Sequence, residues 1–70
     1  MKAPPLHAMD EVALQKDLPE HQLRYGDVGV IVKAFRDGTC DVEFENALGK
    51  VVVLNQFPKE ELLQVRNSRH

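Results

Sequence analysis

The sequence predicts a small all-β domain, and three observations support this prediction. Two segments within Tyr25 to Glu45 are rich in β-branched and aromatic residues, the composition that pleated strands favour. Asp37-Gly38 separates them, and a tight hairpin needs the positive φ that Gly adopts freely and Asp tolerates. The segment from Cys40 to Glu45 alternates apolar with acidic residues, at the period of two that a strand imposes. We therefore expect a β-hairpin around which the rest of the sheet is built.

Length and composition limit the class of protein. The chain of 70 residues has room for one domain. Its hydrophobic fraction of 43% and charged fraction of 29% are ordinary for a folded domain and unlike those of a disordered chain. A chain this short buries only about 60% of the surface that its unfolded form exposes. We therefore expect a thin core, which is completed by closing the sheet on itself or by contact with a partner or a second copy.

Met9 to Gln15 is predicted to be the first strand, because Val12 and Leu14 then share one face. A helix over residues 9–16 is the alternative, since most of these residues are good helix formers. Pro19 favours the strand, because it ends the segment early. Residues 1–8 contain two consecutive prolines and are expected to form an extended, flexible N-terminal tail.

The longest predicted loop runs from Asp17 to Asp27, after the first strand. Leu18 and Leu23 are expected to turn inward and anchor this loop. Gly26 predicts a tight turn into the second strand, and Gly29 predicts either a bulge or a close approach of two backbones.

The second strand, Val28 to Phe35, is apolar at almost every position, which indicates a bend at a barrel corner. In the third strand, alternation places three apolar side chains inward and three carboxylates in solvent. The inward set is Cys40, Val42 and Phe44, and the outward set is Asp41, Glu43 and Glu45. A turn over Asn46 to Lys50 follows, and the apolar run from Val51 to Leu54 is expected to be a central strand.

Asn55 to Leu63 is predicted to form a short helical turn, with Pro58 at its first position. Leu62 to Val65 would be the last strand, paired with the first. The domain then covers residues 9–66, and residues 67–70 are expected to fray. Five short strands, one long loop after the first strand and one helical turn before the last are typical of an SH3-like barrel.

The charge balance argues against a dedicated nucleic-acid binder. The net charge is −2 and the pI is near 5.8, whereas such a protein usually carries a basic excess that releases counterions from phosphates. The single cysteine, Cys40, excludes an internal disulfide framework. No apolar run approaches the roughly 20 residues that span a bilayer, and the N-terminus lacks the apolar segment of a secretory signal. We therefore expect a cytoplasmic protein without a membrane partner.

Six short motifs follow one another along the chain. They are Asp10-Glu11-Val12-Ala13-Leu14, Asp17-Leu18-Pro19, Gly26-Asp27-Val28-Gly29-Val30-Ile31-Val32, Asp37-Gly38, Val42-Glu43-Phe44 and Leu62-Leu63-Gln64-Val65. This succession resembles the pattern of a bacterial family of short uncharacterised proteins, known only as a domain of unknown function. That pattern is close to D-x-V-x-L-x-x-D-L-P, then G-D-x-G-T-I-V, then D-G-x-x-x-V-E-F. The resemblance covers residues 9–66, and Val30 stands where the pattern has Thr.

The resemblance implies an SH3-like barrel, similar in outline to the tail of the β-subunit of nitrile hydratases. Some members are encoded beside another small protein, which suggests a toxin–antitoxin arrangement. A looser resemblance is to ribosomal and transcription-factor SH3-like motifs, whose glycine-flanked strand contacts RNA. Those motifs carry basic residues around the hairpin, whereas this chain has Asp41, Glu43 and Glu45.

No pattern of residues indicates a catalytic, cofactor or metal site, and we expect a protein that is not an enzyme. His7, His21 and His70 are too widely spaced for the short ligand spacings of metal sites. Cys40 alternates with inward apolar residues and precedes a carboxylate that disfavours a thiolate, so we expect a structural cysteine. Gly26 to Gly29 lacks the helix and the Lys-Ser/Thr pair of a phosphate-binding loop.

The carboxylates of the third strand are expected to lie in solvent, where nothing separates their pKa values for acid–base catalysis. They either solubilise the sheet or form an acidic patch for a basic partner. The predicted binding surface is instead the loop after the first strand together with the Phe57-Pro58 segment, which flank a groove in SH3-like barrels. Phe35 and Phe57 are each candidates for either this groove or the core.

We therefore predict a non-enzymatic protein–protein interaction module that binds a neighbour-encoded protein, as an antitoxin-like or immunity-like protein or as an accessory subunit. Weak RNA or DNA binding through the barrel is the alternative, and pairing of an edge strand with a second copy stays open. The candidate partner-binding residues are Leu18, His21, Arg24, Tyr25, Phe57, Asp41, Glu43 and Glu45.

Overall fold

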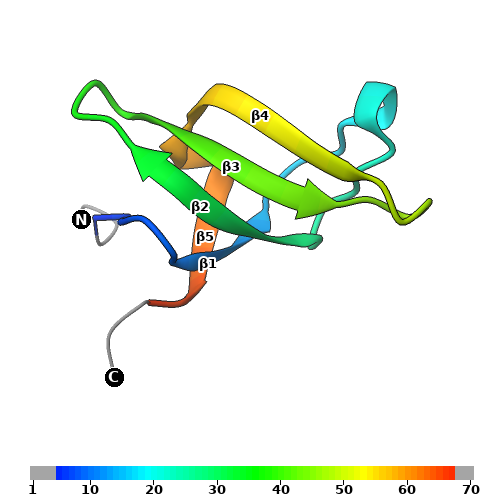
Figure 1. The fold of residues 1–70 in the computed structure, drawn as a ribbon, viewed down its shortest axis with the longest axis horizontal. Helices are drawn as coiled ribbons and strands as arrows, with labels where there is room; N and C mark the ends of the chain where they lie inside the picture. Colours follow the sequence, from blue (N-terminus) through cyan, green and yellow to red (C-terminus); the bar gives the residue numbers. More distant parts are fainter. Residues whose placement is uncertain (1–4, 68–70) are drawn as a thin grey trace.

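The computed structural model describes residues 5–67 and contains one antiparallel sheet of five strands, in the order β4-β3-β2-β1-β5 (Figure 1). The strands are β1 (Glu11–Leu14), β2 (Val28–Ala34), β3 (Thr39–Glu45), β4 (Val51–Pro58) and β5 (Leu62–Arg66). Two 3₁₀ turns, η1 (Pro19–His21) and η2 (Lys59–Glu61), follow β1 and β4. The predicted all-β fold, with a short helical turn before the last strand, is confirmed.

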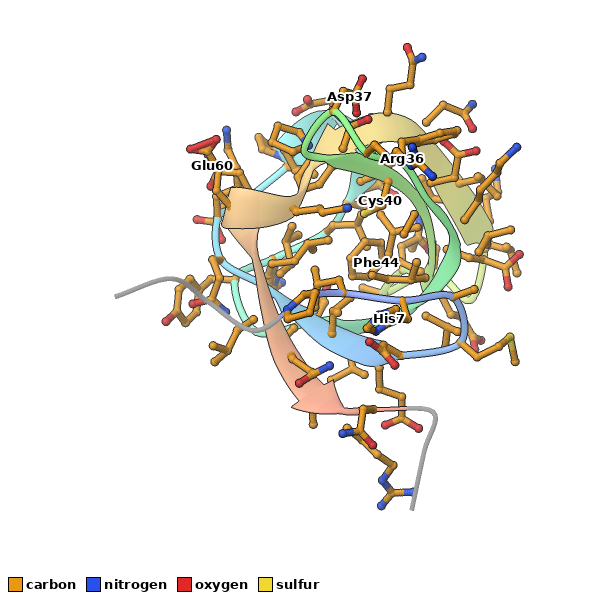
Figure 2. All side chains as sticks on the ribbon, turned by 90° about the vertical axis from the view of Figure 1, so that its left-hand side faces the viewer. His7, Arg36, Asp37, Cys40, Phe44 and Glu60 are labelled. Atoms are coloured by element: carbon orange, nitrogen blue, oxygen red, sulfur yellow. The ribbon has the colours of Figure 1, made fainter. Side chains whose placement is uncertain are left out.

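The core lies on the concave side of this sheet, and β3 supplies its centre. Cys40, Val42 and Phe44 are at most 1% exposed, as the alternation predicted. Figure 2 shows Cys40 and Phe44 inside the ring of strands, whereas Asp37 and Glu60 lie outside it. The same core receives Val12 and Leu14 from β1, which confirms the predicted inward face of that strand.

Gly29 lies where β2 passes close to the backbone of β3 and the ring of Phe44. A Cβ atom at Gly29 would lie 2.6 Å from the carbonyl oxygen of Glu43 and 2.7 Å from two ring carbons of Phe44. Separations below 3.0 Å are essentially never seen for real Cβ atoms. Of the two alternatives predicted at Gly29, the close backbone approach is therefore confirmed. The pairing register of β2 with β3 shifts at a different place, between Ile31 and Lys33.

A second irregularity lies between β3 and β4, and it changes the role of Asp41. Cys40 pairs with Phe57 and Val42 with Leu54, so two residues of β4 lie opposite the single residue Asp41. Gln56 adopts φ of 53° there, and its backbone N–H donates a 2.9 Å hydrogen bond to Oδ1 of Asp41. Asp41 thus lies on the outward face of β3, as the alternation predicted, but it is half-buried and engaged in the bulge, whereas Glu43 and Glu45 are exposed.

Two predictions about the second half of the chain are wrong. The run from Val51 to Leu54 is not central, because β4 lies at the edge of the described sheet and pairs there with β3 alone. The predicted helical turn over Asn55 to Leu63 is shorter, because β4 continues through Pro58 and only η2 is helical. The last strand does pair with the first, since Leu14 lies opposite Leu62 and Ala13 opposite Leu63.

The segment before β1 contributes to the core. Leu6, within the expected tail of residues 1–8, is buried with the core residues. The backbone N–H of Met9 donates to the carbonyl of Ile31 over 2.7 Å, and the buried carboxylate of Asp10 accepts from the N–H of His7 and from Nε2 of Gln64. The chain is therefore attached to the sheet from Leu6 onward. Residues 1–4 and the last three of the predicted frayed end, 68–70, lie outside the described residues.

Candidate partner-binding surface

The long loop between β1 and β2 is closed on itself by a short backbone bridge. The N–H of Leu18 donates to the carbonyl of Leu23 over 2.9 Å, and the N–H of Leu23 donates back over 3.1 Å. η1 lies between them, and Gln22 ends it with φ of 57°. Leu18 and Leu23 are both buried, which confirms that they turn inward and anchor the loop.

Two aspartates hold the end of this loop. Oδ1 of Asp17 accepts from the backbone N–H of Tyr25 over 2.8 Å, and Oδ2 of Asp27 accepts from the N–H of Arg24 over 2.9 Å. The N–H of Gly26, at φ of 92°, donates to the carbonyl of Leu14 over 2.7 Å, which confirms the tight turn. The end of the loop is therefore held by hydrogen bonds from its own residues and from β1. Aspartates in loops commonly accept hydrogen bonds from nearby backbone N–H groups, and this tendency is the sequence signal for the roles of Asp17 and Asp27.

Asn46 connects the loop to the turn between β3 and β4. Its Nδ2 donates to the carbonyl of His21 over 3.1 Å, and its Oδ1 accepts from the N–H groups of Leu48 and Lys50. The sequence predicted Asn46 only as a turn residue. Its contact with a residue 25 positions away fixes η1 relative to the sheet.

One hollow brings together three of the predicted partner-binding residues. We call it the β4 hollow, and it lies between η1 and β4. The apolar residues Leu18, which is buried, and Phe57, which is half-buried, form part of its walls. His21 is half-exposed at its rim. Its lining residues are Leu18, Glu20, His21, Val53, Leu54, Asn55 and Phe57. Phe57 also packs against the core, so it serves both of the roles considered for it.

The other loop residues lie elsewhere. Arg24 lines a second hollow between the loop and the β3–β4 turn, which also contains Pro19 and the 67% exposed Leu48. Tyr25 is 66% exposed and lines neither hollow, and its hydroxyl lies 3.4 Å from Oε1 of Gln15. Phe35 is half-buried, and Nζ of Lys33 lies 5.3 Å from the centre of its ring.

Glu43 and Glu45 lie on the convex face of the sheet, and both are exposed. With Glu11 they line a shallow hollow whose apolar residues include Val28, Val30 and Val51, and we call it the acidic hollow. Within residues 5–67 the acid–base side-chain contact found is Nδ1 of His7 with Asp10, at 3.9 Å, so these three glutamates form no salt bridge in the described part of the chain.

Two titratable side chains among the described residues have shifted pKa values. Burial raises the pKa of the Cys40 thiol, and Asp41 raises it further, while Lys59 acts in the opposite direction. A raised thiol pKa leaves less thiolate, which is the nucleophilic form. The side-chain and backbone hydrogen bonds from Thr39 lower the pKa of Asp37, on the exposed β2–β3 turn. Among residues 5–67, no group of three or more His, Cys, Asp or Glu residues is arranged to hold a metal ion.

The helical segments in the described part of the chain are all too short or too polar to cross a membrane.

Comparisons with curated proteins and with solved structures gave no match. A comparison with protein-family models gave a match over residues 8–64, which include β1 to β4 and most of β5. The chain belongs to a family described as a domain of unknown function, DUF4926.

Proposed function

We propose that this protein is a non-enzymatic interaction module that receives a segment of another protein in the β4 hollow. The observation that carries the proposal is the combination of Leu18, His21 and Phe57 in one hollow, from two segments far apart in sequence. The loop that forms one wall is already fixed by Asp17, Asp27 and Asn46. A preformed site loses less conformational entropy on binding, which favours recognition of a partner segment.

The order of the strands and loops supports this proposal. β1 lies between β2 and β5, a long loop follows β1, and a 3₁₀ turn joins β4 to β5. This arrangement agrees with the SH3-like barrel expected from the sequence, in which the long loop and the segment before the last strand flank a binding groove. The partner would be a cytoplasmic, neighbour-encoded protein, and the role would be that of an antitoxin-like or immunity-like protein or an accessory subunit.

Co-purification of the full chain with the product of the adjacent gene tests this function. We expect a stoichiometric complex that is weakened by His21→Ala and by Phe57→Leu, because both side chains line the β4 hollow. Arg36→Ala, on the exposed β2–β3 turn, is the matched control and should leave the complex intact. Recovery of no stoichiometric protein partner from the native host would refute the proposal. Salt-sensitive recovery of RNA or DNA instead would favour the nucleic-acid alternative.

A further inference from the structure

We infer that the free edge of β4 binds an extended, basic segment of the partner as an additional strand. This inference rests on the proposed function, because it names the part of the surface that is used and the chemistry of the partner. Addition of a strand to an exposed sheet edge is a general mode of peptide recognition, in which backbone hydrogen bonds supply affinity and alternate side chains supply specificity.

The backbone groups that face this edge follow from the pairing of β3 with β4. The N–H of Asn46 donates to the carbonyl of Lys50 over 2.8 Å, and hydrogen-bonded and non-hydrogen-bonded pairs alternate in an antiparallel ladder. The pairs of Val52 and Leu54 with β3 are therefore hydrogen-bonded, and those of Val51 and Val53 are not. The N–H and C=O groups of Val51 and Val53, with those of Asn55, consequently point away from the sheet.

From Val51 to Asn55 this edge carries few of the features that protect edge strands from pairing, and η1 flanks it only across the β4 hollow. Natural proteins block such edges with charged side chains, prolines, bulges or a covering element. The seven residues Val51 to Phe57 carry no charge and no proline, and the bulge at Gln56 lies beyond the first five of them. Val51 and Val53 are 64% and 47% exposed. In the described part of the chain, no backbone hydrogen bond from another segment reaches Val51 to Asn55 apart from those of the β3 ladder.

The charge beside the edge selects a basic partner over a second copy. Glu45 lies opposite Val51 and Glu43 opposite Val53, on the adjacent strand. Both glutamates line the acidic hollow with Glu11, and none of the three forms a salt bridge among residues 5–67. A lysine or arginine on the added strand could extend across the valines to these carboxylates. A second copy would bring the same carboxylates together instead, and like charges repel.

The added strand would meet two different surfaces. A side chain opposite Val51 would lie beside the acidic hollow, whereas side chains opposite Val53 and Leu54 would lie beside the β4 hollow, which both of these residues line. The structure therefore calls for a segment that alternates basic with apolar residues. Val51, Val53 and Asn55 are the three residues whose backbone groups point outward. They alternate along β4, so an added strand of about five residues would reach all three.

A synthetic peptide of sequence Lys-Val-Lys-Val-Lys-Val-Lys, titrated into the full chain and followed by amide hydrogen exchange, tests this inference. We expect the amides of Val51, Val53 and Asn55 to exchange rapidly in the free protein and at least about tenfold more slowly with the peptide bound. The amides of Val52 and Leu54 should be protected in both states. A peptide with N-methylated amides, which cannot donate, should not bind, and a peptide with Glu in place of Lys should bind at least about tenfold more weakly.

Matched variants separate the edge from general effects on the protein. Val53→Lys should abolish peptide binding, whereas Val65→Lys, at a 55% exposed position of β5, should not change it. The double variant Glu43→Gln/Glu45→Gln should weaken binding roughly threefold to tenfold, and Glu60→Gln on η2 should not.

Absence of binding at millimolar peptide, or protection elsewhere in the chain, would overturn the inference. Protection of Val53 without peptide in a dimer would overturn it in favour of a second copy. The proposed function fails separately, if no protein partner is recovered from the host.

Discussion

At Gly29 an added side chain would meet both the backbone of β3 and the buried ring of Phe44. The nearest atom to its absent Cβ is the carbonyl oxygen of Glu43, which belongs to the β3 ladder and cannot turn away. The ring of Phe44, 1% exposed at the centre of the core, occupies the space beside it. Gly29 thereby lets β2 and β3 pack around Phe44 without displacing it.

Gly29→Ala should therefore destabilise the fold by about 2 kcal/mol or more, through overpacking of β2 against β3. Gly26→Ala is an informative comparison, because nothing lies within 4 Å of its Cβ position and its cost arises from φ of 92° alone. We expect about 1 kcal/mol for that variant. Urea unfolding of both variants measures the difference, and an equal loss of stability would contradict the role given to the close approach.

Cys40 is predicted to be unreactive in the folded protein. Its side chain is 0% exposed, and burial raises its pKa. The pKa of this thiol is higher in the folded state than in the unfolded state, so the thiol contributes to stability while it stays protonated. This contribution is fully present below the unfolded-state pKa, and it is lost as the pH rises through the folded-state pKa. An aromatic disulfide reagent should label Cys40 only after unfolding. Stability should fall more steeply above the ordinary thiol pKa in the parent protein than in Cys40→Ala, and equal slopes would contradict this prediction.

At the scale of elements, β4 is the strand whose position decides the function we propose. Its first half provides an uncharged free edge, and its second half is bent by a bulge that directs Phe57 toward the core and the β4 hollow. Asp41 holds this bulge by accepting from the N–H of Gln56, which would otherwise lack a partner in the ladder. One carboxylate thus determines where the edge ends and where the hollow begins.

Asp41→Ala should cost about 1–2 kcal/mol, because the N–H of Gln56 loses its acceptor. Asp41→Asn retains an acceptor oxygen and should recover most of this loss. Glu43→Ala, on the exposed face of the same strand, should stay within about 0.5 kcal/mol of the parent protein. Thermal unfolding monitored by circular dichroism would compare the three variants. A loss in Glu43→Ala as large as that in Asp41→Ala would refute the assignment.

At the scale of the whole molecule, the segments outside the sheet complete a core that the strands alone leave open. Leu6 packs with the core from the N-terminal side, and η2 is joined to the β2–β3 hairpin by Lys59. The N–H of Lys59 donates to the carbonyl of Gly38, and its Nζ donates to the carbonyl of Phe35 over 2.6 Å. A small domain has few buried residues to lose, so each of these attachments matters to its stability.

Leu6→Ala should destabilise the domain by about 2 kcal/mol, although the residue precedes the first strand. Leu48→Ala serves as the control, because Leu48 is 67% exposed and its truncation should cost less than about 0.5 kcal/mol. Chemical denaturation of the two variants under identical conditions is the measurement. Equal stability of the two variants would show that residues before β1 contribute nothing to the core.

The sequence by itself determined the all-β class, the inward face of β3 and the anchoring leucines of the loop, and it predicted either a bulge or a close approach at Gly29. These features depend on local rules, since side chains alternate along a strand and only certain residues fit a turn. The motifs also led to an uncharacterised domain family, in agreement with the match over residues 8–64.

Only the tertiary structure decided which strand lies at the edge, which carboxylate is engaged and which segments meet across the β4 hollow. A fully apolar run such as Val51 to Leu54 suits either a central or an edge strand, and its place depends on pairing with residues distant in sequence. The bulge that engages Asp41 likewise depends on the register between β3 and β4, which no local pattern encodes. The proposed binding surface arises from these long-range pairings, and sequence periodicity describes only one strand at a time.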